Sequence, residues 1–310
     1  MDALSEVLRL ARLTGGVVAD VAARGAWCAS VPAGGARAFG HLLLEGRATL
    51  QAAGSEPVSL QPGDFAFLPR GEAHLVASDP GASATPLSSL ARSPTPGDAP
   101  IAVLGSGSPR ARWIVLAFSW ERHLGDSLFS ALPSPMRVPL GGSPAPAWLA
   151  ESLGLSLSGS DAPRVGGDAT RERLAQVVLV EALRRHVESL APSGTGWLPA
   201  LADRHVGAAL ALVHGRPSEN WTVERLGRQV GLSRSALAER FSQKMGEPVI
   251  AFLTRVRLQL AAEELVATGR SIEAVSEDAG YESVTAFSRA FKRAFGKPPS
   301  VWRQRARKRR

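Results

Sequence analysis

A short pattern that is written twice constrains this chain more than any other feature. Residues 221–245 read WTVERLGRQVGLSRSALAERFSQKM, and residues 271–296 read SIEAVSEDAGYESVTAFSRAFKRAFG. Each copy places a helix-capping hydroxyl, a turn glycine and a second capping serine around two short apolar-periodic stretches. These positions are Thr222, Gly231 and Ser233 in the first copy and Ser271, Gly280 and Ser283 in the second. The chain therefore predicts two helix-turn-helix units.

The second helix of each copy has two different faces. Phe287, Phe291 and Phe295 are spaced four apart, as are Leu237 and Phe241 in the first copy, so each set predicts a buried stripe. The opposite faces are then exposed, and small polar residues with an arginine suit a DNA groove. The residues predicted to contact bases are Ser235, Ala238, Glu239, Val284, Thr285, Ser288 and Arg289. The residues predicted to contact phosphates are Arg234, Lys292 and Arg293, and phosphate contact is also the alternative for Arg289.

A long helix is predicted between the two copies. Pro248 suits its first turn, and Gly269 suits its end. About nineteen helical residues at ~1.5 Å each span roughly 28 Å. One turn of B-DNA is ~34 Å, so such a helix could hold two recognition helices in successive major grooves.

The second copy also carries a family signature. Its Gly-Tyr-Glu-Ser turn, Ala-Phe-Ser-Arg-Ala-Phe-Lys-Arg helix and Phe-Gly-Lys-Pro-Pro ending resemble the AraC/XylS-type transcription regulators, over about residues 203–303. The resemblance implies a sequence-specific regulator that binds double-stranded DNA and RNA polymerase and is not an enzyme. The alternative is a helical bundle whose aromatic stripe serves only as core.

The net charge of +8 is unevenly distributed along the chain. Residues 203–310 hold 20 basic and 11 acidic residues, a net charge of +9, whereas the 16 basic and 17 acidic residues before them give −1. A basic surplus beside the doubled motif favours phosphate binding. The terminal basic run, residues 304–310, is either a weak phosphate contact or a solvated tail.

The single cysteine, Cys28, permits no intramolecular disulfide, and no export signal or apolar run of membrane-spanning length occurs. These features predict a cytoplasmic protein.

The N-terminal half has a different texture. Leu4, Val7, Leu8 and Ala11 share one face of a short helix at residues 3–13, which we expect to pack on the part of the chain that follows it. Short β-type segments then predict a barrel or sandwich. They are VVADV, AWCASV, AFGHLLLEG, RATLQA, PVSL, DFAFLP and AHLVAS, with a later strand at Trp113–Ser119.

A second resemblance lies in these strands. Gly63 to His74 has the Gly-five-Pro-x-Gly-two-His spacing of the second cupin motif, and His41 with Glu45-Gly46 fits the later half of the first. The resemblance implies a cupin-like effector domain with a small-molecule pocket near Phe39, His41 and His74. His41, Glu45 and His74 are candidate ligands for a divalent metal, although Phe39 replaces one histidine of metal-binding cupins. The alternative is that both histidines are ordinary core or pocket groups, and no cofactor is required.

The segments after the strands are less regular. Residues 79–109 predict a loop, residues 148–157 a helix, and residues 170–190 a longer helix with a broad apolar face. That face serves either a homodimer, as the resemblance implies, or burial within the chain.

The sequence thus predicts an α+β chain of two domains. A cupin-like β-barrel with flanking helices, at residues 1–190, serves effector binding and dimerisation, and a linker at residues 191–202 leads to an all-α unit of about seven helices at 203–303. The predicted function is a transcription regulator that responds to a small molecule. The alternatives are a metal-dependent cupin enzyme with a DNA-binding appendage and a sequence-neutral DNA-packaging protein.

Overall fold

The computed structural model describes residues 3–35, 37–89, 101–108, 110–120, 128–141, 148, 152–153, 166–190 and 194–307. The chain forms two compact units. One contains all the described strands and helix α4. The other contains the N-terminal helix and the chain from residue 190 onward.

The strands form two sheets, as expected for a cupin-like domain, and the sheets do not close into a barrel. The six-stranded sheet has the order β11 (Met136–Pro139), β6 (Asp64–Leu68), β3 (Ala38–Glu45), β10 (Arg110–Ser119), β1 (Thr14–Arg24), β9 (Ile101–Gly105). The five-stranded sheet has the order β5 (Val58–Leu60), β4 (Ala48–Ala52), β7 (His74–Ala77), β2 (Cys28–Val31), β8 (Ala84–Pro86). Every strand segment predicted from the sequence is present.

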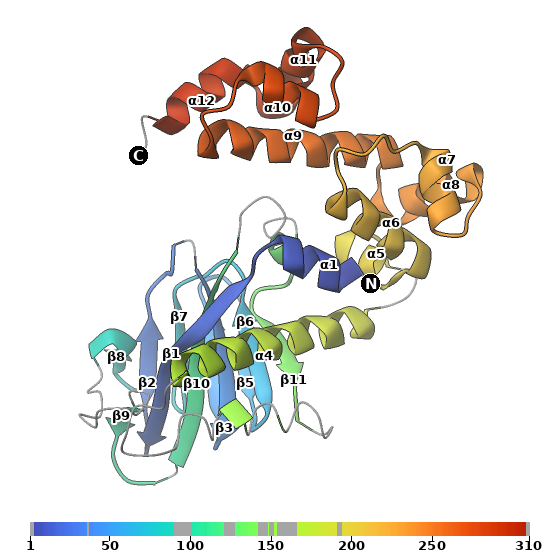
Figure 1. Ribbon diagram of the computed structural model, residues 1–310. Coiled ribbons are helices and arrows are strands. Elements are labelled where there is room, and N and C mark those ends of the chain that lie inside the picture. The colour runs from blue at the N-terminus through green and yellow to red at the C-terminus, as the bar shows by residue number, and fades with distance from the viewer. Residues whose placement is uncertain are drawn as a thin grey trace. The chain divides into compact units, whose positions relative to one another are not determined.

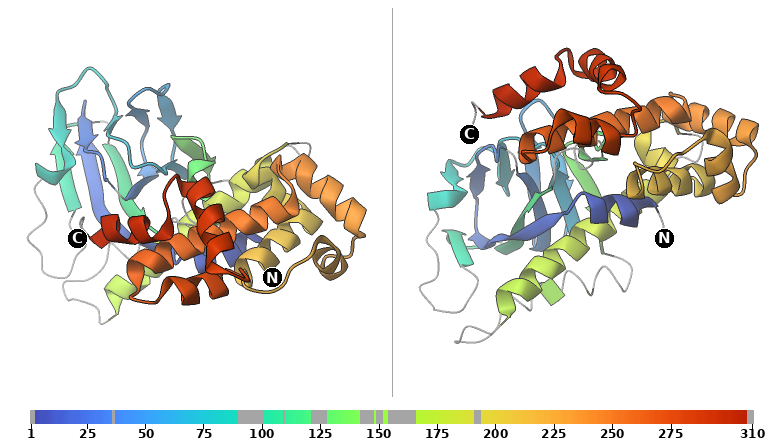
Figure 2. Two further views of the ribbon diagram at one scale, coloured as in Figure 1. Left: turned by 90° about the horizontal axis from the view of Figure 1, so that it is seen from above. Right: turned by 45° about the horizontal axis from the view of Figure 1, so that its top comes forward.

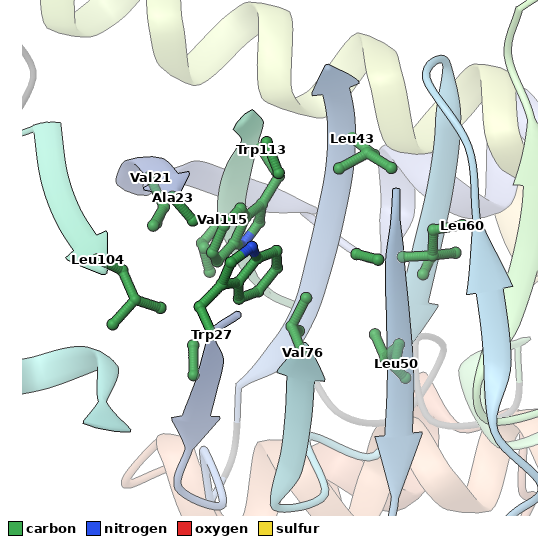
Figure 3. Packing of buried hydrophobic residues seen from close by; sticks show 14 of the residues in the cluster. Val21, Ala23, Trp27, Leu43, Leu50, Leu60, Val76, Leu104, Trp113 and Val115 are labelled. Atoms are coloured by element: carbon green, nitrogen blue, oxygen red, sulfur yellow. The ribbon is translucent and has the colours of Figure 1, made fainter. Parts of the chain in front are cut away.

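The main core of this unit includes residues of both sheets (Figure 3). The rings of Trp27 and Trp113 stack there with centroids 4.5 Å apart. Trp113 and Val115 belong to this core, whereas Ile114, between them on β10, is equally buried on the other face of the strand. Both faces of the six-stranded sheet are therefore covered.

The covering element on the outer face is α4 (Gly167–Ser189), which packs on β1 and β11 and lies across the strands in Figure 1. The predicted helix at 170–190 is thus confirmed. Much of its broad apolar face is buried within the chain, as Val178 and Leu183 show. Val177 and Val180 are exceptions, 44% and 38% exposed.

The predicted loop at 79–109 contains regular structure, which corrects that expectation. Strand β8, the short 3-10 helix η1 (Leu87–Ser89) and strand β9 form there. β8 pairs with β2 and β9 pairs with β1, both in parallel. These strands are formed by hydrogen bonds to distant segments, so they could not be predicted from a local composition rich in Ser, Pro and Gly. Residues 90–100 and 109 lie outside the described residues, as does most of the predicted helix at 148–157.

The second unit is all-helical, as predicted. After α5 (Trp197–Ala202) its helices are α6 (Arg204–Gly215), α7 (Val223–Gln229), α8 (Arg234–Met245), α9 (Val249–Ala267), α10 (Ile272–Asp278), α11 (Val284–Phe295) and α12 (Pro299–Arg307). α5 occupies part of the predicted linker and packs on α6 and α8. The predicted basic tail at 304–310 begins inside α12, and residues 308–310 lie outside the described residues.

The N-terminal helix, α1 (Ala3–Leu10), differs from expectation in its partner. Its apolar face is buried as predicted, with Val7 and Ala11 fully inaccessible. The face packs on α6 and α5 of the helical unit and not on the strands that follow. Periodicity determines that a helix has an apolar face, but not which apolar surface covers it.

Two further sequence expectations concern the environment of the chain. Cys28 is a buried free cysteine. Within the described part of the chain, no helix combines the length and apolar character needed to span a bilayer.

Candidate nucleic-acid interface and effector pocket

The first helix-turn-helix is formed by α7 and α8, with the predicted caps. The Thr222 hydroxyl accepts a hydrogen bond from the Arg225 amide, and the Ser233 hydroxyl accepts one from Ala236. Gly231, in the turn, has a φ of +75°, which favours glycine. A hydrogen bond of 2.7 Å between His205 Nδ1 and the Val230 carbonyl ties this turn to α6.

The second helix-turn-helix, formed by α10 and α11, repeats this geometry. The hydroxyls of Ser271 and Ser283 cap the two helices by accepting from Ala274 and Ala286. Gly280 has a φ of +77° in the turn. The doubled sequence pattern therefore corresponds to a doubled structure.

The predicted buried stripes are present on both second helices. Leu237, Phe241, Phe287 and Phe291 are fully buried, and Phe295 is half-buried against Trp302, with ring centroids 5.1 Å apart. The ring of Phe291 lies within 6 Å of three others, those of Phe287, Phe295 and Trp302. This packing of aromatic rings determines which face of α11 points outward.

The residues predicted to contact DNA lie on the outward faces. Ser235, Glu239, Thr285 and Arg289 are exposed, and Ala238, Val284 and Ser288 are half-buried. The predicted phosphate contacts, Arg234, Lys292 and Arg293, are exposed as well. Arg289 has no ion-pair or hydrogen-bond partner among the described residues, so its guanidinium is available to a ligand, whereas Glu239 accepts a hydrogen bond from Gln243.

Helix α9 connects the two helix-turn-helix units. In Figure 1 the α7–α8 pair lies at one end of α9 and the α10–α11 pair lies alongside the middle of this helix, and Figure 2 shows the red helices along α9 in both views. Its 19 residues span roughly 28 Å. From its middle, Arg257 donates hydrogen bonds of 2.7 Å to the carbonyls of Pro217 and Glu219, before the first helix-turn-helix. The same guanidinium lies 3.0 Å from the position of a Cβ on Gly280, in the second turn.

In the other unit, the structure brings the three predicted pocket residues together. The Nε2 atoms of His41 and His74 are 2.7 Å apart, and the Phe39 and His74 rings have centroids 5.7 Å apart. Both histidines are buried, His41 on β3 and His74 on β7, so the pair links the two sheets.

The hydrogen bonds of this histidine pair determine which ring nitrogen atoms carry a proton. The Glu72 carbonyl can only accept, so His74 Nδ1 donates to it over 2.7 Å, and His74 Nε2 accepts from His41. Burial, with the neighbouring His74, holds the pKa of His41 well below its ordinary value. Burial also lowers the pKa of His74, against the opposing effect of the Glu72 carbonyl. Both rings are therefore neutral near pH 7.

The candidate metal ligands do not fit a divalent ion. The two histidine Nε2 atoms hydrogen-bond each other, and Glu45 is exposed at the end of β3, beyond a register shift that skips Leu44. Across the described ranges, no group of three His, Cys, Asp or Glu side chains is placed to hold a metal.

Two cavities adjoin the pocket residues. One, of about 690 Å³, is lined by His74 and by residues of β2, β4 and β7. The other, of about 320 Å³, is lined by Phe39 and by residues of both sheets. They share Val31, Pro32 and Ser88 in their walls. Both volumes are within the ~300–1,000 Å³ typical of small-molecule sites.

Comparison with known proteins identifies the family. Residues 2–188 match a cupin family model, and residues 226–305 match a helix-turn-helix domain model. The chain is 31% identical to an AraC-like transcription regulator of Streptomyces antibioticus, over 98% of this chain and 99% of that one. It is also 31% identical to the HTH-type transcriptional regulator AlkR of Acinetobacter baylyi, over 99% of this chain and 100% of AlkR. The chain belongs to the AraC-type transcription regulators. It is a DNA-binding regulator and not an enzyme.

Among solved structures, this AraC-type regulator is similar to the C-terminal domain of AraT, a response regulator from Geobacillus stearothermophilus. The two are 30% identical over 31% of this chain and 80% of that one, with a TM-score of 0.30.

Sequence reasoning missed three residues of this regulator that the structure places at the sites. Arg37 lines the smaller cavity, Arg257 bonds the loop before the first helix-turn-helix and lies beside the turn of the second, and Arg240 on α8 pairs with Asp203 at 2.9 Å. Asp203 stands directly before an apolar helical stretch, which is a readable capping signal. No local sequence pattern indicates the roles of Arg37 and Arg257.

Asp203 provides a prediction about pH. Burial acts to raise its pKa, but the amides of Val206 and His205 and the Arg240 guanidinium outweigh burial and hold the pKa below the ordinary value. A depressed carboxyl pKa stabilises the fold above the ordinary value of ~3.9, and this stability is lost as pH falls through the folded-state pKa. We expect Asp203→Ala to cost about 1–2 kcal/mol at pH 7, measured by urea unfolding.

At pH 3 the wild-type protein and the Asp203→Ala variant should differ less than at pH 7, because this pH is below the ordinary carboxyl pKa of ~3.9 and part of the stability from the ion pair and the cap is then lost. Glu224→Ala, at an exposed position on α7, is the control. A difference for Asp203→Ala that stayed constant between pH 7 and pH 3 would contradict the assigned ion pair and cap.

Proposed function

We propose that this regulator reads its operator with the exposed faces of α8 and α11. Ser235, Ala238, Glu239, Val284, Thr285, Ser288 and Arg289 contact bases in this proposal, and Arg234, Lys292 and Arg293 contact phosphates. The exposure of these cations without ion-pair partners among the described residues supports it, because a paired guanidinium would have to break its pair to bind DNA. The protein then acts in the cytoplasm, together with RNA polymerase.

Isolating the operator and measuring its affinity tests this proposal. Genomic fragments retained by the purified protein are sequenced, and the strongest is titrated against random competitor DNA at 50 and 200 mM salt. A sequence-specific regulator should bind the fragment at least ~10³-fold more tightly than random DNA at one salt concentration. Equal binding would favour sequence-neutral packaging.

We further propose that the cupin-like domain senses a small organic molecule. The observation that supports this is the convergence of Phe39, His41 and His74 beside two cavities of sufficient size. A neutral, buried histidine pair offers hydrogen bonds without the desolvation cost of a charge. A metal is not part of this proposal, and metal analysis of the purified protein is its check.

We expect Phe39→Ala and His74→Ala each to reduce the response of a target promoter to its inducer by about tenfold or more. Phe39→Ala removes apolar contact area, and His74→Ala leaves His41 unpartnered in the core. The measurement is promoter activity with and without inducer, together with operator affinity without inducer, which should be unchanged. Thr49→Ala, at a half-buried position on β4, is the control. An unchanged response in both variants would place the pocket elsewhere.

A homodimer through α4 is the last element of the proposal. Val177 and Val180 lie in its outward stripe with Arg173 and Arg184, and both valines are exposed. Burial of apolar area by a second copy would stabilise a pair of such helices. Val177→Asp with Val180→Asp should convert a dimer to monomer in sedimentation experiments, while a mass unchanged from the wild-type value would exclude this face.

A further inference from the structure

The smaller cavity has an apolar wall with one charge at its edge. Its volume is about 320 Å³, and the wall is lined by Val18, Ala19, Phe39, Leu87, Ala102 and Ala117. These side chains come from β1, β3, β9 and β10 of one sheet and from η1. Arg37 is the one charged side chain among the described residues that line the cavity.

The backbone around Arg37 is held in place. The Arg37 amide donates to the Gly34 carbonyl over 3.2 Å, and the Gly34 amide donates to Gly71 over 2.9 Å. A Cβ on Gly71 would lie 2.0 Å from the Arg37 carbonyl oxygen, and a Cβ on Gly34 would lie 2.7 Å from the Phe39 ring. Glycine at both positions allows these close approaches, which bring the Arg37 backbone against Gly71 and the Gly34 backbone against the Phe39 ring.

The Arg37 guanidinium has no acidic partner among the described residues. It is exposed, and it makes no ion pair or side-chain hydrogen bond within the part of the chain that the structure describes. Two other arginines of this unit differ, because Arg112 donates to the buried Asp20 and Arg137 donates to the buried Asp64. An unpaired cation beside an apolar wall is complementary to a molecule with an apolar body and one negative charge.

We propose that the effector of this regulator is a small apolar monocarboxylate, held by the walls of this cavity and anchored at its carboxylate by Arg37. This inference rests on the proposed effector role of the domain. The planar guanidinium matches a carboxylate with two parallel hydrogen bonds. The apolar walls favour an alkyl or aryl body, and the volume, at the lower end for ligand sites, selects a small one.

Octanoate and its uncharged analogue octanamide test the proposal by isothermal titration calorimetry on the full chain. We expect octanoate to bind at least about tenfold more tightly than octanamide. Arg37→Gln should remove that preference and leave octanamide affinity unchanged, and Arg37→Lys should restore part of it. Arg47→Gln, at an exposed position in the β3–β4 turn, is the matched control and should bind octanoate as the wild type does.

A cavity-filling variant places the binding site. Ala117→Leu narrows the cavity from β10 and should weaken both ligands, whereas it would not affect binding to a surface arginine alone. Equal affinity for the two ligands, a preference that survives Arg37→Gln, or no binding of either ligand would overturn the monocarboxylate. The wider effector role is judged separately, by the promoter response of Phe39→Ala and His74→Ala.

Discussion

Replacing Phe291 with alanine is expected to destabilise the second helix-turn-helix by about 3–5 kcal/mol, the usual cost of removing a fully buried aromatic ring. The Phe291 side chain is inaccessible and contacts three other rings, so its loss leaves a cavity that cannot easily collapse. The measurement is urea unfolding followed by helical circular dichroism, with hydrogen exchange to locate the loss in α10 to α12.

Phe295→Ala is the matched control, because it removes the same group from the same stripe of α11. Phe295 is half-buried, so its replacement should cost clearly less than that of Phe291. The hydrogen exchange of the cupin-like domain should be unchanged in both variants. Equal costs for the two substitutions would mean that the stripe is not packed as the structure has it.

Replacing Arg289 with alanine is expected to weaken operator binding by about 1–3 kcal/mol, or roughly fivefold to 150-fold, and to relax the preference at one or two base pairs. Arg289 is exposed on α11 between the buried Phe287 and Phe291, so its planar fork points away from the core. No described side chain depends on it, and the stability of the protein should not change. Binding isotherms on the operator and on single-base variants measure the effect.

Lys292→Ala provides the comparison, three residues further along the same helix. If Lys292 contacts a phosphate, its removal should weaken binding to all sequences alike. It should also reduce the slope of log affinity against log salt concentration by about one unit. If Arg289→Ala weakened operator and random DNA equally, Arg289 would be a phosphate contact as well.

The helical unit could be predicted from the sequence almost residue by residue, because its signals are local. A capping hydroxyl acts on an amide three residues away, and a turn glycine is needed where φ is positive, so Ser233, Gly231 and Ser283 are readable in place. The buried stripe of Phe287 and Phe291 follows from helical spacing alone. The strands β1 to β7 were readable for a similar reason, since alternation and turn residues bound them.

The candidate effector site was only partly readable. Phe39, His41 and His74 came from a motif resemblance, and the structure places them together. The exclusion of Glu45 depends on a register shift in β3, and the position of Arg37 beside Phe39 depends on a turn closed against Gly71. Neither follows from local residue preferences.

The sequence by itself determined the two helix-turn-helix units, the basic surplus beside them and the two-domain organisation. The tertiary structure alone decided that α1 packs on α6, that β8 and β9 extend the sheets and that α5 occupies part of the predicted linker. It alone also decided that Arg257 joins the loop before the first helix-turn-helix to the turn of the second. The physical reason is the range of the interactions. Caps, turns and helical stripes act over a few residues, whereas an apolar face, a strand edge or a guanidinium accepts any complementary surface that the folded chain brings to it.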